Sequence, residues 1–126
     1  MKYNTEVTFA SFVTRTRIAQ GMTMRALADA LGVSSPYLYD VEQGKRSPLK
    51  KEHLEKMVEI FSLNEEETAL MFDLAGIDRG IVPLDLQSYI LSNPCVRIVL
   101  RKARDKNFKE VEWQKIIAQM EKLGEK

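Results

Sequence analysis

The sequence predicts an all-α protein, with a helical domain in residues 1–78 and a short helical extension in residues 79–126. Two observations lead to this fold class. Apolar residues recur at helical spacing along most of the 126-residue chain. The segments that carry them begin near Ser, Thr or Asn and end near Gly or Pro, the residues that start and stop helices. The apolar share of 44% is that of an ordinary globular protein.

Five helices are expected in the first domain. In chain order they cover residues 6–20, the segment from Thr23 to Gly32, the segment from Ser34 to Gly44, residues 51–61 and residues 65–75. Their inward-facing residues are expected to be Phe9, Phe12, Val13, Thr16, Leu27, Ala28, Leu31, Val33, Leu38, Val41, Leu54, Met57, Val58 and Phe61, with Ala69, Leu70, Phe72 and Leu74 in some combination. Asn64 is a candidate cap for the fifth helix. Gly76 should end that helix, and residues 77–83 should form a linker.

The extension is expected to hold three short helices, at about residues 84–91, 94–105 and 109–123. The second and third of these carry apolar stripes, Val96-Val99-Leu100-Ala103 and Trp113-Ile116-Ile117-Met120-Leu123. So short a segment cannot bury both stripes by itself. They must therefore pack against the first domain or against a second subunit.

The segment from Gly21 to Pro48 carries the most specific pattern in the chain. Gly32-Val33-Ser34 joins two short helices that have to cross steeply, with Val33 filling the joint, and this arrangement describes a helix-turn-helix. The matching residues are Thr23, Leu27, Ala28, Leu31, Gly32, Val33, Ser34, Leu38, Val41, Glu42, Gly44, Arg46 and Pro48. At this spacing the chain resembles the phage-repressor-like helix-turn-helix regulators, also called the xenobiotic-response-element family, over roughly residues 8–75.

The resemblance implies a five-helix DNA-binding domain whose third helix enters the major groove. It also implies an ion pair between Arg17 and Glu42, since a charge close to a core is tolerated when it is paired. Two positions depart from the family pattern. Met24 stands where many members have a Gln that contacts a phosphate, and Thr16 stands where a core Leu is common.

The residues expected to contact DNA fall into two groups. Side chains at the start and on the outer side of the recognition helix should meet base edges: Ser35, Pro36, Tyr37 and Asp40. For Asp40 the alternative is an ion pair with Lys45 or Arg46, because phosphates repel a carboxylate. Residues at the helix ends and in the following loop should contact backbone phosphates, which gives affinity and register. These are Thr23, Arg25, Ser34, Tyr39, Gln43, Lys45 and Arg46.

Charge and composition narrow the function further. Residues 1–50 hold seven Lys or Arg against four Asp or Glu, whereas residues 51–78 hold two against eight, so the basic part coincides with the expected DNA-binding face. A single Cys excludes an intramolecular disulfide and a zinc site built on cysteine pairs, and one His adds few further metal ligands. We find no catalytic constellation, metal signature, cofactor motif or membrane-spanning segment. We therefore expect a cytoplasmic, non-enzymatic protein that needs no cofactor.

These observations favour a sequence-specific transcriptional regulator of double-stranded DNA, and we expect a repressor that binds a palindromic operator as a homodimer. The alternative is an antitoxin-type interaction module that neutralises a protein partner and binds its own promoter. A weaker alternative is a ligand sensor whose pocket lies in the extension. A partner gene beside this one would favour the antitoxin.

Overall fold

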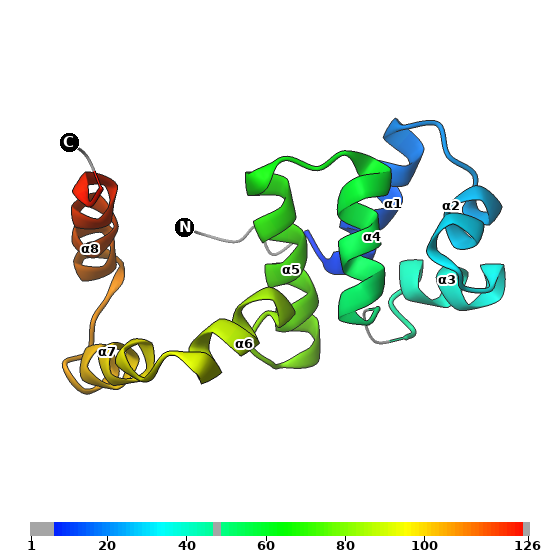
Figure 1. The fold of residues 1–126 in the computed structure, drawn as a ribbon. Coiled ribbons are helices and arrows are strands. Elements are labelled where there is room, and N and C mark those ends of the chain that lie inside the picture. The colour runs from blue at the N-terminus through cyan, green and yellow to red at the C-terminus, as the bar shows by residue number, and fades with distance from the viewer. Residues whose placement is uncertain (1–6, 47–48, 125–126) are drawn as a thin grey trace. The chain divides into compact units, whose positions relative to one another are not determined.

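The computed structural model describes residues 7–46 and 49–124, and all the regular structure in these ranges is helical (Figure 1). The all-α prediction is therefore confirmed. The chain divides into two compact units between Ser88 and Tyr89. The predicted boundary between two functional domains, after residue 78, stays a prediction.

The helices follow the predicted order. Their bounds are α1 Phe9–Ala19, α2 Met24–Leu31, α3 Ser35–Glu42, α4 Lys51–Phe61, α5 Glu65–Arg79, α6 Leu84–Ser92, α7 Pro94–Asp105 and α8 Glu110–Lys122. Helices α1 to α5 and the start of α6 belong to the first unit, and the remainder forms the second. Residue 6, the predicted start of the first helix, lies outside the described residues, but Thr8 is the observed cap and the helix begins later, at Phe9.

Helices α2, α3 and α5 begin where their predicted capping residues place them, whereas α4 has no side-chain cap. The hydroxyls of Thr23 and Ser34 accept hydrogen bonds from the backbone N–H groups of Ala26 and Tyr37, at 3.0 and 3.2 Å. The Asn64 side chain likewise accepts from the Glu67 N–H at 2.8 Å. Each cap satisfies a donor that the first helical turn would otherwise leave unpaired.

The core of the first unit lies between α1, α2, α3, α4 and α5. Its buried residues are Phe9, Val13, Leu27, Ala28, Leu31, Leu38, Val41, Leu49, Leu54, Met57, Phe61, Met71, Phe72, Leu74 and Ala75. Most of the expected core is confirmed, but Ala69 is exposed and Met71 is fully buried instead. Apolar residues occur on several sides of α5, so helical spacing alone did not determine its buried face.

The predicted end of α5 at Gly76 is wrong, because the helix continues to Arg79 and ends at Gly80. Gly80 has a left-handed backbone, φ +67°, which favours glycine. Gly76 is buried within the helix and lies against the chain that follows. A Cβ at this position would lie 2.9 Å from the carbonyl oxygen of Ile81 and 3.2 Å from Pro83. Because Gly76 has no side chain, the chain at Ile81 and Pro83 can pass close to its backbone. The linker is therefore residues 80–83, shorter than the predicted 77–83.

A buried polar network ties α3 to α1. Arg17 donates from Nε to the Glu42 carboxylate at 2.8 Å and from a second nitrogen at 3.1 Å. Thr14 donates its hydroxyl to the same carboxylate at 2.9 Å. Arg17 also donates to the carbonyl oxygen of Met22, at 2.9 Å, in the turn before α2. The side chains of Glu42 and Arg17 are only 2% and 14% exposed.

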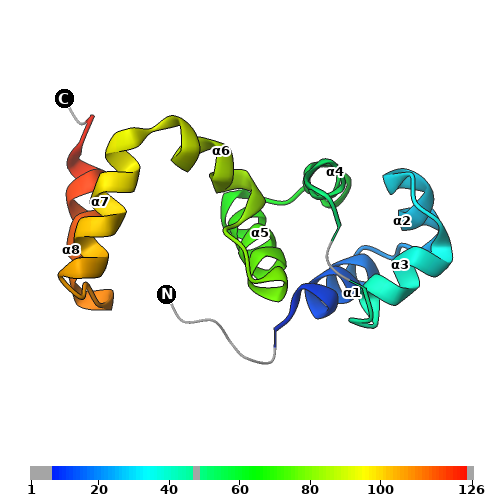
Figure 2. The same ribbon diagram turned by 90° about the horizontal axis from the view of Figure 1, so that it is seen from below.

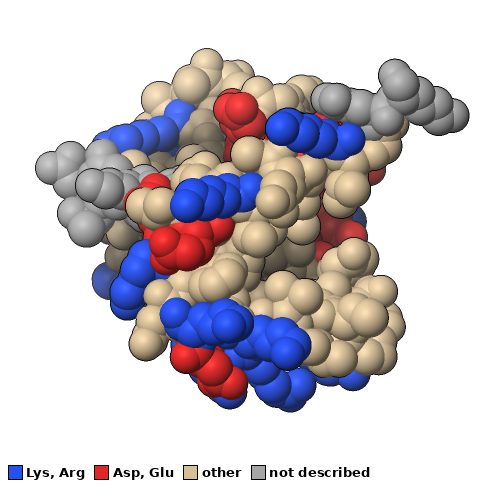
Figure 3. Space-filling view, turned by 90° about the vertical axis from the view of Figure 1, so that its left-hand side faces the viewer, with Lys and Arg blue, Asp and Glu red and all other residues tan. Residues whose placement is uncertain are grey.

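The second unit has little core of its own. Among its described residues, Ala103 is the one buried side chain, and the rings of Phe108 and Trp113 meet edge to face at 5.5 Å. Asn93 does not cap α7 with its side chain, which donates to the Tyr89 carbonyl oxygen instead. Many large apolar side chains stay exposed, and Figure 3 shows uncharged surface beside clustered Lys and Arg.

The Arg17–Glu42 pair should be strongly coupled. Replacing one partner, as in Arg17→Met or Glu42→Gln, should lower the free energy of unfolding by about 3 kcal/mol, because it strands a buried polar partner. The double variant should lose much less than the sum of the two. Denaturant melts would measure all three. The exposed Arg104–Asp105 pair is a matched control, and Arg104→Met should change stability by less than about 1 kcal/mol. Additive, small losses at Arg17 and Glu42 would contradict the assignment.

Candidate nucleic-acid interface

Helices α2 and α3 lie side by side at one end of the first unit, next to α1 (Figures 1 and 2). The turn between them depends on Gly32, whose left-handed backbone, φ +77°, ends α2. Val33 is half-buried and packs on the core, and Ser34 then caps α3. These three residues set the crossing of the two helices, which is the geometry of a helix-turn-helix.

Helix α3 turns one side inward and leaves the other to solvent. Leu38, Val41 and Glu42 are buried, and helical spacing places Pro36 and Asp40 on the opposite side. Among the predicted base-reading residues, Pro36 is exposed, whereas Ser35, Tyr37 and Asp40 are half-buried. All four side chains reach the surface.

The predicted phosphate-contacting residues are all exposed. They are Thr23, Arg25, Ser34, Tyr39, Gln43, Lys45 and Arg46. Thr23 and Arg25 lie at the start of α2, Ser34 at the start of α3, and Gln43, Lys45 and Arg46 just after α3. Cations and helix N-termini therefore flank the outer side of α3, an arrangement suited to a polyanionic backbone.

One contact at this surface was missed by sequence reasoning. The guanidinium carbon of Arg46 lies 5.2 Å from the centre of the Tyr37 ring, within the range of a cation–π interaction. The two residues are brought together by the turn that follows α3, so helical spacing gave no signal for the contact. Asp40 forms no ion pair with Lys45 or Arg46, both of which are described.

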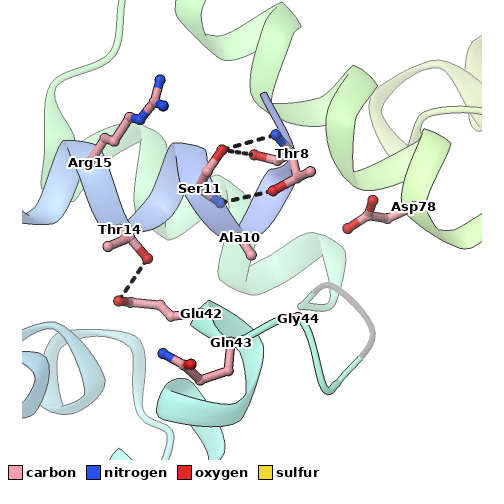
Figure 4. Close-up of a pocket in the computed structure, with 9 residues that line it drawn as sticks. All are labelled: Thr8, Ala10, Ser11, Thr14, Arg15, Glu42, Gln43, Gly44 and Asp78. Carbon is pink, nitrogen blue, oxygen red and sulfur yellow. Dashed lines mark hydrogen bonds between the residues drawn. The ribbon is translucent and has the colours of Figure 1, made fainter. Parts of the chain in front are cut away.

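An open pocket of about 620 Å³ lies beside this surface and shares Gln43 with it, where α1, the end of α3 and the end of α5 meet (Figure 4). Four of its polar side chains, those of Thr8, Ser11, Thr14 and Glu42, already have structural roles. Thr8 and Ser11 bond to each other at the start of α1, and Thr14 donates to Glu42. We therefore interpret this space as part of the packing between the three helices.

Two further searches cover the described part of the chain. It contains no group of three or more His, Cys, Asp or Glu side chains placed to hold a metal ion. No helix within residues 7–46 and 49–124 is long and apolar enough to cross a membrane. Cys95 is exposed in the first turn of α7.

Comparison with known proteins gives one match. A protein-family model described as a helix-turn-helix domain matches residues 8–71, which is half of the chain. Neither the comparison with curated proteins nor the comparison with solved structures gives a match. The matched residues run from the N-cap of α1 into α5, so they include the turn between α2 and α3.

The cap of α3 can be tested directly. Ser34→Ala should lower the free energy of unfolding by about 1 kcal/mol, because the Tyr37 N–H loses its acceptor at the start of the helix. Denaturant melts would measure the loss. Ser88→Ala is the control, since Ser88 is exposed within α6 and alanine is the better helix former there. If Ser34→Ala had the same free energy of unfolding as Ser88→Ala, the Ser34 cap would contribute nothing to stability.

Proposed function

Since the chain belongs to the helix-turn-helix family, whose members are DNA-binding regulators, we propose that it is a sequence-specific transcriptional repressor. The observation that carries this proposal is the exposed side of α3 between two sets of exposed cationic and polar residues. A domain bound at an operator keeps other proteins off the same DNA. Repression therefore requires no further activity from this chain.

Base readout would come from the outer side of α3 in the major groove. The Ser35 hydroxyl can donate or accept, the Pro36 ring can press on a thymine methyl, and the Asp40 carboxylate can accept from a cytosine amino group. Asp40 is free of an ion pair with Lys45 or Arg46, which leaves its oxygens available for such a contact.

Affinity would come from phosphate contacts on both sides of this helix. Arg25 at the start of α2 and Lys45 and Arg46 after α3 supply positive charge. Thr23 and Ser34 use their oxygens as caps, so their hydroxyl hydrogens remain free to donate. Such contacts fix the register of the protein on the duplex and carry little sequence information.

We further propose that the protein binds a palindromic operator as a homodimer. One recognition helix covers few base pairs, so useful specificity requires two half-sites about 34 Å apart, related by a two-fold axis. The second unit supports this proposal, because α7 and α8 expose Val99, Ile117 and Met120 at about half their surface or more. Exposed apolar side chains that form a large contiguous patch mark sites of protein–protein interaction.

The same surface supports a second candidate. An antitoxin-type protein would use these exposed side chains of α7 and α8 to bind a partner of another sequence, while α3 binds its own promoter. The two candidates differ in what covers the second unit. A purified chain that is monomeric alone but forms a stable complex with the product of an adjacent gene would favour the antitoxin.

DNA binding should be selective and strongly salt-dependent. Each neutralised phosphate adds about 0.9 to the slope of log affinity against log salt concentration, so three cationic contacts should give a slope of about −3. Selection from a random duplex library, followed by anisotropy across salt concentrations, would measure both properties. Lys45→Ala should lower the slope by about one. Lys115 is exposed on α8 in the second unit, so Lys115→Ala is the charge-matched control and should leave the slope unchanged. A wild-type protein that enriches no sequence would contradict the proposal.

The dimer can be tested with the full-length chain. The double variant Met120→Glu, Leu123→Glu should shift sedimentation towards the monomer at tens of micromolar protein, because it places charge on exposed apolar positions of α8 and its end. Gln114→Glu with Gln119→Glu adds the same charge at exposed polar positions of the helix and should leave the dimer intact. A wild-type chain that sediments as a monomer would remove the second unit from this role.

A further inference from the structure

Tyr37 has surroundings unlike those of a side chain that is free to enter a groove. It is half-buried, it packs against the core of the first unit, and its backbone N–H is held by the Ser34 cap. The Arg46 guanidinium lies over its ring, with 5.2 Å between Cζ and the ring centre. Contact with the core on one side and with a cation over the ring leaves less of the ring for a base.

Arg46 itself is exposed and follows the end of α3 in a turn. A free arginine side chain populates many rotamers, and ordering one on binding has an entropic cost. Stacking on an anchored ring removes part of that cost before DNA arrives. The contact uses the positive charge of the guanidinium, so N–H donors that point away from the ring remain available to a phosphate.

We propose that Tyr37 is a positioning residue for Arg46. It holds the guanidinium over a ring that is fixed to the core, so that Arg46 meets the DNA backbone in a prepared orientation. This inference rests on the proposed DNA-binding function and replaces the base-reading role that the sequence alone suggests for Tyr37. It also ties the turn after α3 to the start of the same helix, since Tyr37 lies in the first turn of α3.

Three substitutions separate this role from base reading. Tyr37→Phe keeps the ring and should bind like wild type, because the stack does not use the hydroxyl. Tyr37→Leu keeps apolar bulk but removes the π face, and it should weaken binding about two- to fivefold, the range of an exposed cation–π contact. Arg46→Lys keeps the charge but removes the planar guanidinium that Tyr37 is proposed to orient. Tyr37→Leu should therefore weaken DNA binding less in the Arg46→Lys background than in wild type.

The experiment is a double-mutant cycle on Tyr37→Leu and Arg46→Ala. It uses the full-length chain and the duplex that the wild-type protein selects from a random library. Arg46→Ala should weaken binding about two- to fivefold less in the Leu background than in wild type, and Tyr37→Leu should leave the selected sequence unchanged. Thermal melts of each variant confirm that it remains folded.

A second measurement needs no DNA. The Arg46 side-chain protons should shift upfield in the NMR spectrum because of the Tyr37 ring current, and the shift should be lost in Tyr37→Leu but kept in Tyr37→Phe. Additive effects in the cycle, a changed sequence preference in Tyr37→Leu, or the absence of the ring-current shift would each overturn the inference. If the wild-type chain bound no DNA, both the proposed function and this inference would be wrong. If it bound DNA but the effects of Tyr37→Leu and Arg46→Ala were not coupled, only this inference would be wrong.

Discussion

The Glu42 carboxylate is the point on which the arrangement of the first unit depends. Glu42 is the last residue of α3, and it is buried with both oxygens accepting hydrogen bonds from α1. Arg17, one of its two partners, also bonds to the carbonyl oxygen of Met22 before α2 begins. A single carboxylate therefore links α1, the approach to α2 and the end of α3. The direction in which α3 points outward follows from this junction.

The geometry of the junction matters more than its net energy. Burying an ion pair costs desolvation that its attraction only partly offsets, so apolar residues of similar size often stabilise a fold as well. Apolar contacts, however, are not directional. The hydrogen bonds to Glu42 have fixed donors, acceptors and angles, and they hold α3 in one orientation against α1. A helix that is proposed to enter the major groove would benefit from such a constraint.

Much of this could be predicted from the sequence, because caps and helical spacing are local signals. Thr23, Ser34 and Asn64 mark their helix starts correctly. The errors come from contacts between segments. Gly76 looks like a helix end until its backbone is seen against Ile81, and Leu49 is a core residue in a loop, where helical spacing does not apply. The stack of Arg46 on Tyr37 likewise depends on the path of the turn after α3.

The exposed apolar residues of the second unit have a consequence for the lifetime of the protein in a cell. Leu91 and Leu123 are 73% and 78% exposed, and large apolar patches left uncovered on a protein are an aggregation liability, while cells triage aggregation-prone and unfolded chains by chaperones and proteases. A chain whose second unit is uncovered would be removed faster than one whose second unit is covered. If a second copy or another protein covers the second unit, as proposed above, the amount of the protein would depend on how much of it is covered, and degradation would remove the rest.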